Sequence, residues 1–315
     1  MVSNKRFQKR IMRIILTSFV EGISNVWANR FLIGMMFLFR LVFSLILLSP
    51  LYLMFSASFA TNVKASNFLT WFDLSLFIDF VYHWRKTLSV YFLMFILVCG
   101  LAMLVFIFLS GGFWGTLRDL IKNREQNSKM EIFFGYCGKY FWGMFKISLF
   151  MIVLYFIALF LFLFLSVILS SITGEASWWE ITSWHMVVKF LIAIILFFLV
   201  NMSGDYLRIF LVENFGERFF GVVGKTFRFL LTNLLKTLSL YYLLSIVLVV
   251  IIFVYLQIYG IMNGMPQTGF FIFLIFMVQQ IFVVFRSFYR LVFYSSQLVL
   301  HDKISNKEAC VLEAK

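Results

Sequence analysis

The sequence predicts an all-α, multi-pass membrane protein with about six transmembrane helices. Of its 315 residues, 63% are hydrophobic and only 13% are charged, whereas soluble domains carry about 25% charged residues. The apolar residues form continuous runs of about 20 residues, not the period-two alternation of barrel strands. Because hydrocarbon offers no partner to backbone N–H and C=O groups, these runs are expected to be helices.

Each expected span is close to the ~20 residues that cross ~30 Å of hydrocarbon. In chain order the six spans are 31–55, 88–110, 146–170, 186–204, 237–260 and 269–288. Residues 1–30 form a basic N-terminal interfacial segment, residues 31–298 form the transmembrane domain, and residues 299–315 form a polar tail that we expect to be loose.

Lysine and arginine are distributed unevenly between the connections. The two terminal segments and the connections 113–146 and 205–236 together hold 22 of them, whereas the alternate connections hold four. Cytoplasmic connections carry an excess of basic residues, so both termini and the two basic connections are expected in the cytoplasm. The net charge of +13 lies in blocks between apolar runs, which indicates membrane orientation. We expect no nucleic-acid partner.

The pattern FFGxxGKxF occurs twice, at residues 133–141 and 219–227. Each copy follows a short polar stretch, 110–112 or 203–205, which we expect to interrupt a helix, and each precedes a pair of spans. A basic and aromatic segment also precedes the first pair. We therefore expect three parallel repeats, each a basic amphipathic interfacial helix followed by a transmembrane hairpin.

Residues 215–236 show the periodicity of an amphipathic helix that lies in the head-group plane. Basic residues there are attracted to anionic lipid by roughly 1 kcal/mol each. Lys139 and Lys225 occupy matching positions of the two motif copies and are candidates for holding a lipid phosphate. The simpler interpretation, which we favour, is a solvated face with ordinary positive-inside bias.

Ionisable residues within apolar segments are candidates for function. Arg40 lies deep in the bilayer if the first span begins at residue 31, and it reaches the cytoplasmic head groups if the helix begins near residue 36. We favour the second alternative. Asp205 and Arg208, three residues apart at the end of the fourth span, are expected to form a local ion pair.

The sixth span also carries polar residues. Gln279, Arg286 and Arg290 share one helical face, with Gln280 beside it. This face either lines a polar cavity or pairs with Asp205. Alternatively, the arginines mark the cytoplasmic end of the helix and the glutamines form hydrogen bonds between helices, and we favour this second interpretation.

No pattern associated with catalysis or metal binding is present. The sequence lacks HExxH, paired Cys/His spacing, a GxSxG elbow and a Walker A loop, which are the short motifs that carry such chemistry. Its histidines, His83, His185 and His301, are far apart. We therefore expect no enzyme activity, no metal and no cofactor.

Several segments resemble those of a known group of proteins. These segments are SFVEGI, FDLSLFIDF, LSGGFWGTLRD, FFGYCGKYFWGMFKISL and SGDYLRIFLVENFGERFFGVVGKTFRFLLTN. The chain is similar to uncharacterised bacterial six-span membrane proteins and to the membrane domain attached to some glycerophosphodiester phosphodiesterases. The resemblance implies a protein of the bacterial cytoplasmic (inner) membrane, and it supplies no catalytic residue.

Two functions from different classes follow from these observations. The first is a non-catalytic membrane component that organises anionic lipid head groups at the cytoplasmic face, or a membrane protein partner. The alternative is a transporter of small solutes or lipid with a polar path near Arg40, Gln279, Gln280 and Arg286. The sixth span lacks the Gly/Pro interruption typical of transport helices, so we favour the first.

Overall fold

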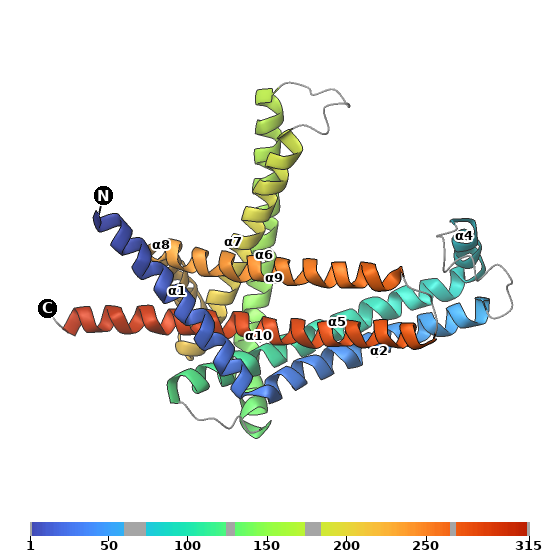
Figure 1. The fold of residues 1–315 in the computed structure, drawn as a ribbon, viewed down its shortest axis with the longest axis horizontal. Coiled ribbons are helices and arrows are strands. Elements are labelled where there is room, and N and C mark those ends of the chain that lie inside the picture. The colour runs from blue at the N-terminus through green and yellow to red at the C-terminus, as the bar shows by residue number, and fades with distance from the viewer. Residues whose placement is uncertain (1, 60–73, 124–129, 174–183, 265–268, 314–315) are drawn as a thin grey trace. The chain divides into compact units, whose positions relative to one another are not determined.

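The computed structural model describes residues 2–59, 74–123, 130–173, 184–264 and 269–313, and every regular element in these ranges is a helix (Figure 1). The helices are α1 Val2–Ala28, α2 Arg30–Phe59, α4 Leu74–His83, α5 Arg85–Asn123, α6 Met130–Thr173, α7 Trp184–Glu213, α8 Phe219–Thr232, α9 Leu234–Asn263 and α10 Gly269–Glu313.

Six of these helices are long and apolar enough to cross a membrane, namely α2, α5, α6, α7, α9 and α10. The prediction of six long apolar helices is therefore confirmed. Large apolar side chains are exposed along all six. Exposing such a large apolar surface to water is unfavourable, whereas acyl chains solvate it.

Three helices extend well past their predicted spans, each at the end with basic connections. α5 continues from residue 110 to Asn123, α6 begins at Met130 instead of residue 146, and α10 continues from residue 288 to Glu313. At 1.5 Å per residue, the 44 residues of α6 extend about 66 Å, roughly twice the hydrocarbon thickness. These helices are therefore longer than the bilayer core alone requires.

The expectation of a loose segment from Val299 is wrong. Val299, Leu300 and Ile304 are buried within α10. The polar residues around them made this stretch look like a solvated tail, but the apolar positions keep a helical spacing and pack against the rest of the protein.

The polar stretches 110–112 and 203–205 do not interrupt their helices, contrary to expectation. The hydroxyls of Ser110 and Ser203 donate to the carbonyls of Ile107 and Leu199, at 2.7 and 2.8 Å. Bonding to the preceding turn satisfies the serine within an unbroken helix.

Two helix breaks among the described residues occur at asparagines. Asn29 separates α1 from α2, and Asn233 separates α8 from α9. Counting along the two motif copies, the position in α6 that corresponds to Asn233 is Ile147. α6 is continuous there. The basic segment before the third span is therefore the first part of that span's helix, and the expectation of a separate interfacial helix is wrong for this repeat.

The chain divides into two compact units. Unit 1 comprises Met1–Ile33 and Ile107–Lys315, and unit 2 comprises Gly34–Phe106. In unit 2, the hydroxyl of Tyr91 donates to the carbonyl of Leu47 at 2.9 Å, and the rings of Phe55 and Phe80 stack at 4.6 Å. These contacts join α2 to α5 and α4.

Unit 1 contains most of the buried residues. α6 and α7 pair along their length, and α10 packs against α1 and α9 (Figure 1). Every side chain from Leu291 to His301 is buried. A helix buried on all sides must be surrounded by other helices, so this stretch of α10 is the centre of unit 1.

Candidate functional site

Glycines allow the helices of unit 1 to approach closely. A Cβ added at Gly112 of α5 would lie 2.5 Å from the Cys137 sulfur and 2.8 Å from the Phe133 ring of α6. One added at Gly22 of α1 would lie 2.9 Å from the backbone nitrogen of Ser296 in α10. Such small residues are typical of contacts between membrane helices.

The glycines of the FFGxxGKxF motif have a different environment. A Cβ at Gly135, Gly138, Gly221 or Gly224 would meet nothing within 4 Å. These four glycines therefore do not make close helix contacts among the described residues.

A polar cluster joins α7 to α10 in the interior of unit 1. Asp205, only 2% exposed, pairs with Arg208 at 2.9 Å, as expected, and accepts a hydrogen bond from Gln297 at 3.4 Å. Arg290 lies close enough to Asp205 to interact electrostatically, and its Nε donates to the Tyr294 hydroxyl at 3.0 Å. The buried carboxylate is therefore compensated by two cations.

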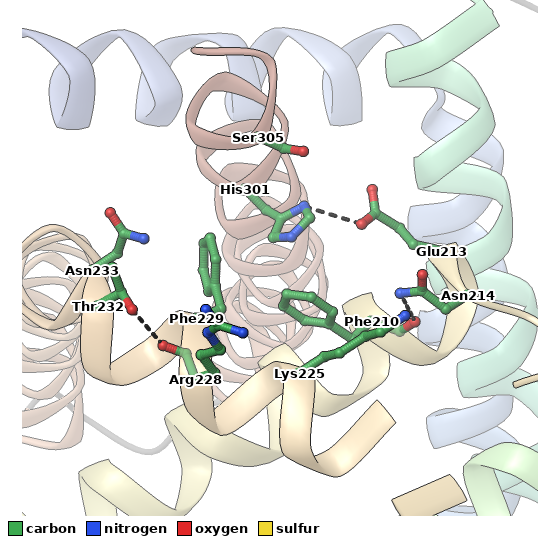
Figure 2. A pocket seen from close by; sticks show the side chains of 10 residues that line it. All are labelled: Phe210, Glu213, Asn214, Lys225, Arg228, Phe229, Thr232, Asn233, His301 and Ser305. Atoms are coloured by element: carbon green, nitrogen blue, oxygen red, sulfur yellow. Dashed lines mark hydrogen bonds and ion pairs between the residues drawn. The ribbon is translucent and has the colours of Figure 1, made fainter. Parts of the chain in front are cut away.

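A cavity of about 470 Å³ opens between α7, α8 and α10 (Figure 2). Its volume lies within the roughly 300–1,000 Å³ usual for small-molecule sites. It is lined by Phe210, Glu213, Asn214, Lys225, Arg228, Phe229, Thr232, Asn233, His301 and Ser305.

One wall of the cavity is a pair formed by a histidine and a carboxylate. Nδ1 of His301 lies 3.3 Å from Oε2 of Glu213, and Oε1 of Glu213 lies 3.4 Å from Nζ of Lys122. The rings of Phe210 and Phe229 flank the imidazole, with centroids at 4.8 and 4.9 Å. Each carboxylate oxygen of Glu213 thus has a basic nitrogen within 4 Å, although Nδ1 of His301 is not within hydrogen-bond geometry.

The opposite wall carries positive charge. Figure 2 shows the side chains of Lys225 and Arg228, both from α8, across the cavity from His301. Nζ of Lys225 pairs with Oε1 of Glu217 at 2.5 Å.

Among the described residues no cluster of three or more His, Cys, Asp or Glu could hold a metal ion. The donor set of this wall suits an anion.

α8 presents three faces at helical spacing. Val222, Thr226 and Leu230 are buried. The basic face, with Lys225, Arg228 and Thr232, lines the cavity. The exposed apolar face has Phe220 at 80% and Leu231 at 73% exposure. This combination of a buried, a basic and an exposed apolar face is unusual for a helix surrounded by water.

Asp205, Arg208 and Arg290 come together in the polar cluster. Of the other candidates on α10, Gln279 and Gln280 are half-buried and Arg286 is exposed.

Lys225 lines the cavity, whereas Lys139 is exposed and its Nζ lies 5.0 Å from the centre of the Phe215 ring. Arg40 is half-buried in α2 and belongs to unit 2. Since α2 begins at Arg30, the premise of a helix start near residue 36 is wrong. The depth of Arg40 in the bilayer stays a prediction.

Of the residues that line the cavity, only Lys225 was a candidate from the sequence, and those that were missed include Glu213, Arg228, Asn233 and His301. His301 had been assigned to the polar tail. The signal that could have found it is the apolar run Leu298–Leu300, which continues the helix between Gln297 and His301. A histidine that ends a buried run is a better candidate for an interior position than one in a solvated tail.

The helices and the cavity define the class of the protein. It has the six long apolar helices of a multi-pass integral membrane protein, and in unit 1 a partly basic cavity at one end of the apolar helices. Comparisons with family models, curated proteins and solved structures give no match for this chain.

Proposed function

We propose that this chain is a non-catalytic protein of the bacterial inner membrane that organises anionic lipid, or a membrane protein partner, at its cytoplasmic face. In this proposal the ends of the helices with basic connections face the cytoplasm. The distribution of lysine and arginine, 22 against four, supports this orientation.

The observation that carries the proposal is the surface of α8. Its exposed apolar face, with Phe220 and Leu231, lies beside its basic face, with Lys225 and Arg228. A helix at the membrane–water boundary inserts such an apolar face among acyl chains and keeps cations at head-group level. Anionic head groups then collect around the cations.

The three-repeat interpretation supports the same function. α1 and α8 each end at a buried asparagine and precede an apolar helix, and α6 begins with the other copy of the motif. We propose that each of the three repeats presents cations at the same side of the bilayer, because each repeat crosses the bilayer twice.

The double variant Lys139→Gln, Lys225→Gln tests the proposal. We expect the purified variant to retain several-fold less anionic phospholipid, mainly through the loss of Lys225 at roughly 1 kcal/mol, and to lose protein partners recovered with the wild type. The matched control is Lys86→Gln, because Lys86 is an exposed lysine at the start of α5, away from the basic connections. This control should retain the anionic phospholipid and the protein partners. Unchanged lipid and partner recovery in the double variant would contradict the proposal.

The alternative is a polar transport path. The observation in its favour is the polar cluster of Asp205, Arg208 and Arg290, which joins two apolar helices. A path along α10 predicts that cysteines placed at Gln279 and Arg286 react with a water-soluble thiol reagent. Unreactive positions would exclude the path and leave the lipid proposal in place.

A further inference from the structure

We propose that the cavity between α7, α8 and α10 is a binding site for the phosphate ester of an anionic phospholipid head group. This inference rests on the proposed function and goes further, because it assigns one open cavity and a defined set of donors. Diffuse attraction to a basic surface needs neither.

The first step is the charge balance of the cavity. Lys225 and Arg228 are its cations and Glu213 is its carboxylate. Glu213 is already engaged by Lys122 and His301. Among the described residues, the Arg228 guanidinium has no hydrogen-bond or ion-pair partner. A planar guanidinium suits two phosphate oxygens at once, so the cavity offers an unused phosphate donor.

The second step is an independent observation at the α8–α9 junction. Asn233 lines the cavity and is 6% exposed. Its Oδ1 accepts a hydrogen bond from Lys236 at 2.8 Å, but its Nδ2 has no partner among the described residues. A buried N–H without an acceptor is costly and rare. Nδ2 itself has almost no exposed surface, so a rotation of the Asn233 side chain would bring it to the cavity, where an oxyanion would supply that acceptor.

The third step is the source of the phosphate. On α8, the exposed positions Phe220 and Leu231 lie next to the face that lines the cavity. A phosphate held by Arg228 therefore has an exposed apolar surface beside it, along which acyl chains can lie. A soluble phosphate ester would gain nothing from that surface, and this favours a lipid.

The test measures phosphatidylglycerol bound to the full chain in nanodiscs of phosphatidylcholine. Arg228→Gln removes the charge of an exposed side chain. Asn233→Asp keeps the oxygen that accepts from Lys236 and replaces the unpaired donor with a carboxylate. Arg218→Gln is the matched control, since Arg218 precedes α8 and does not line the cavity.

We expect Arg228→Gln and Asn233→Asp each to weaken phosphatidylglycerol binding about tenfold or more, as for loss of a charge-assisted hydrogen bond. Arg218→Gln should change it less than about twofold. Unchanged thermal unfolding midpoints would show that the variants fold, and a misfolded Asn233→Asp would leave Arg228→Gln to decide.

Three results would overturn the inference. Equal losses in all three variants would mean diffuse attraction, which contradicts the cavity site and leaves the proposed function standing. Binding of inorganic phosphate that depends on Arg228, with phosphatidylglycerol binding independent of it, would assign the cavity to a soluble ligand. No preference of the wild type for phosphatidylglycerol over phosphatidylcholine would remove both proposals.

Discussion

The two copies of FFGxxGKxF share a sequence pattern but differ in structure. The first copy lies at the start of the continuous helix α6, whereas the second lies in the short helix α8, which ends at Thr232. Both lysines are exposed. Lys139 lies beside the rings of Tyr140 and Phe215, whereas Lys225 lines a cavity and pairs with Glu217.

The difference is explained by the residue that follows each copy. Ile147, 0% exposed, is packed in the interior and continues α6. At the corresponding position, Asn233 has φ −115° and ψ 24°, outside the helical region, and separates α8 from α9. The break frees α8 to form one wall of the cavity. The two copies thus differ at the position that follows them, where α6 continues and α8 ends.

The variant Ile147→Asn should show the largest effect of the changes that test this comparison. It deletes buried aliphatic volume and introduces an amide without partners, so we expect a loss of about 3 kcal/mol or more in the free energy of unfolding. Chemical unfolding in detergent measures it, with the isosteric Ile147→Leu as control. A variant as stable as the wild type would mean that the interior around residue 147 is not closely packed.

Alanine at Gly112 should have the next largest effect. Its methyl group would overlap the Cys137 sulfur and the Phe133 ring of the first motif copy, so we expect destabilisation of about 1–3 kcal/mol. Gly135→Ala is the control within the motif, where the added methyl meets nothing within 4 Å, and it should be neutral or slightly stabilising. Unfolding midpoints of both variants decide the matter. Equal midpoints would contradict the close approach of α5 to α6.

The single variants Lys139→Gln and Lys225→Gln should differ least in stability but separate the two copies by function. Both lysines are exposed, and their ring or ion-pair contacts contribute less than about 1 kcal/mol. Lipid retention should fall about fivefold for Lys225→Gln and less than about twofold for Lys139→Gln. Mass spectrometry of lipid retained by the purified protein measures this. A larger loss for Lys139→Gln would place lipid binding at the other copy.

The six apolar helices could be predicted from the sequence because lipid exposure requires continuous apolar runs, which need no tertiary information. The lengths of α5, α6 and α10 could not. Where a helix leaves the bilayer and packs against protein, polar residues such as Ser295 and Gln297 can be buried. Hydropathy alone then suggests an end to the helix where none exists.

The candidate site divides in the same way. Lys225 was a candidate because the motif repeats, although a solvated face was the favoured interpretation, and the side chain is exposed. Glu213, Asn233 and His301 come from segments far apart in the chain, and only packing brings them to one cavity. The pairing of Asp205 with Arg208 could be predicted because both residues lie on one helix. The contact of Asp205 with Gln297 could not be predicted, because Gln297 lies on α10.

The central claim is that the basic ends of the six helices face the cytoplasm, where Lys225 and Arg228 meet anionic lipid. Cysteine labelling in intact cells tests it most directly, with Arg218→Cys and Gly264→Cys placed in a variant without native cysteines. We predict that a membrane-impermeant thiol reagent labels Gly264→Cys at once and Arg218→Cys only after permeabilisation. Labelling of Arg218→Cys in intact cells, with Gly264→Cys protected, would contradict the proposed orientation and the lipid site built on it.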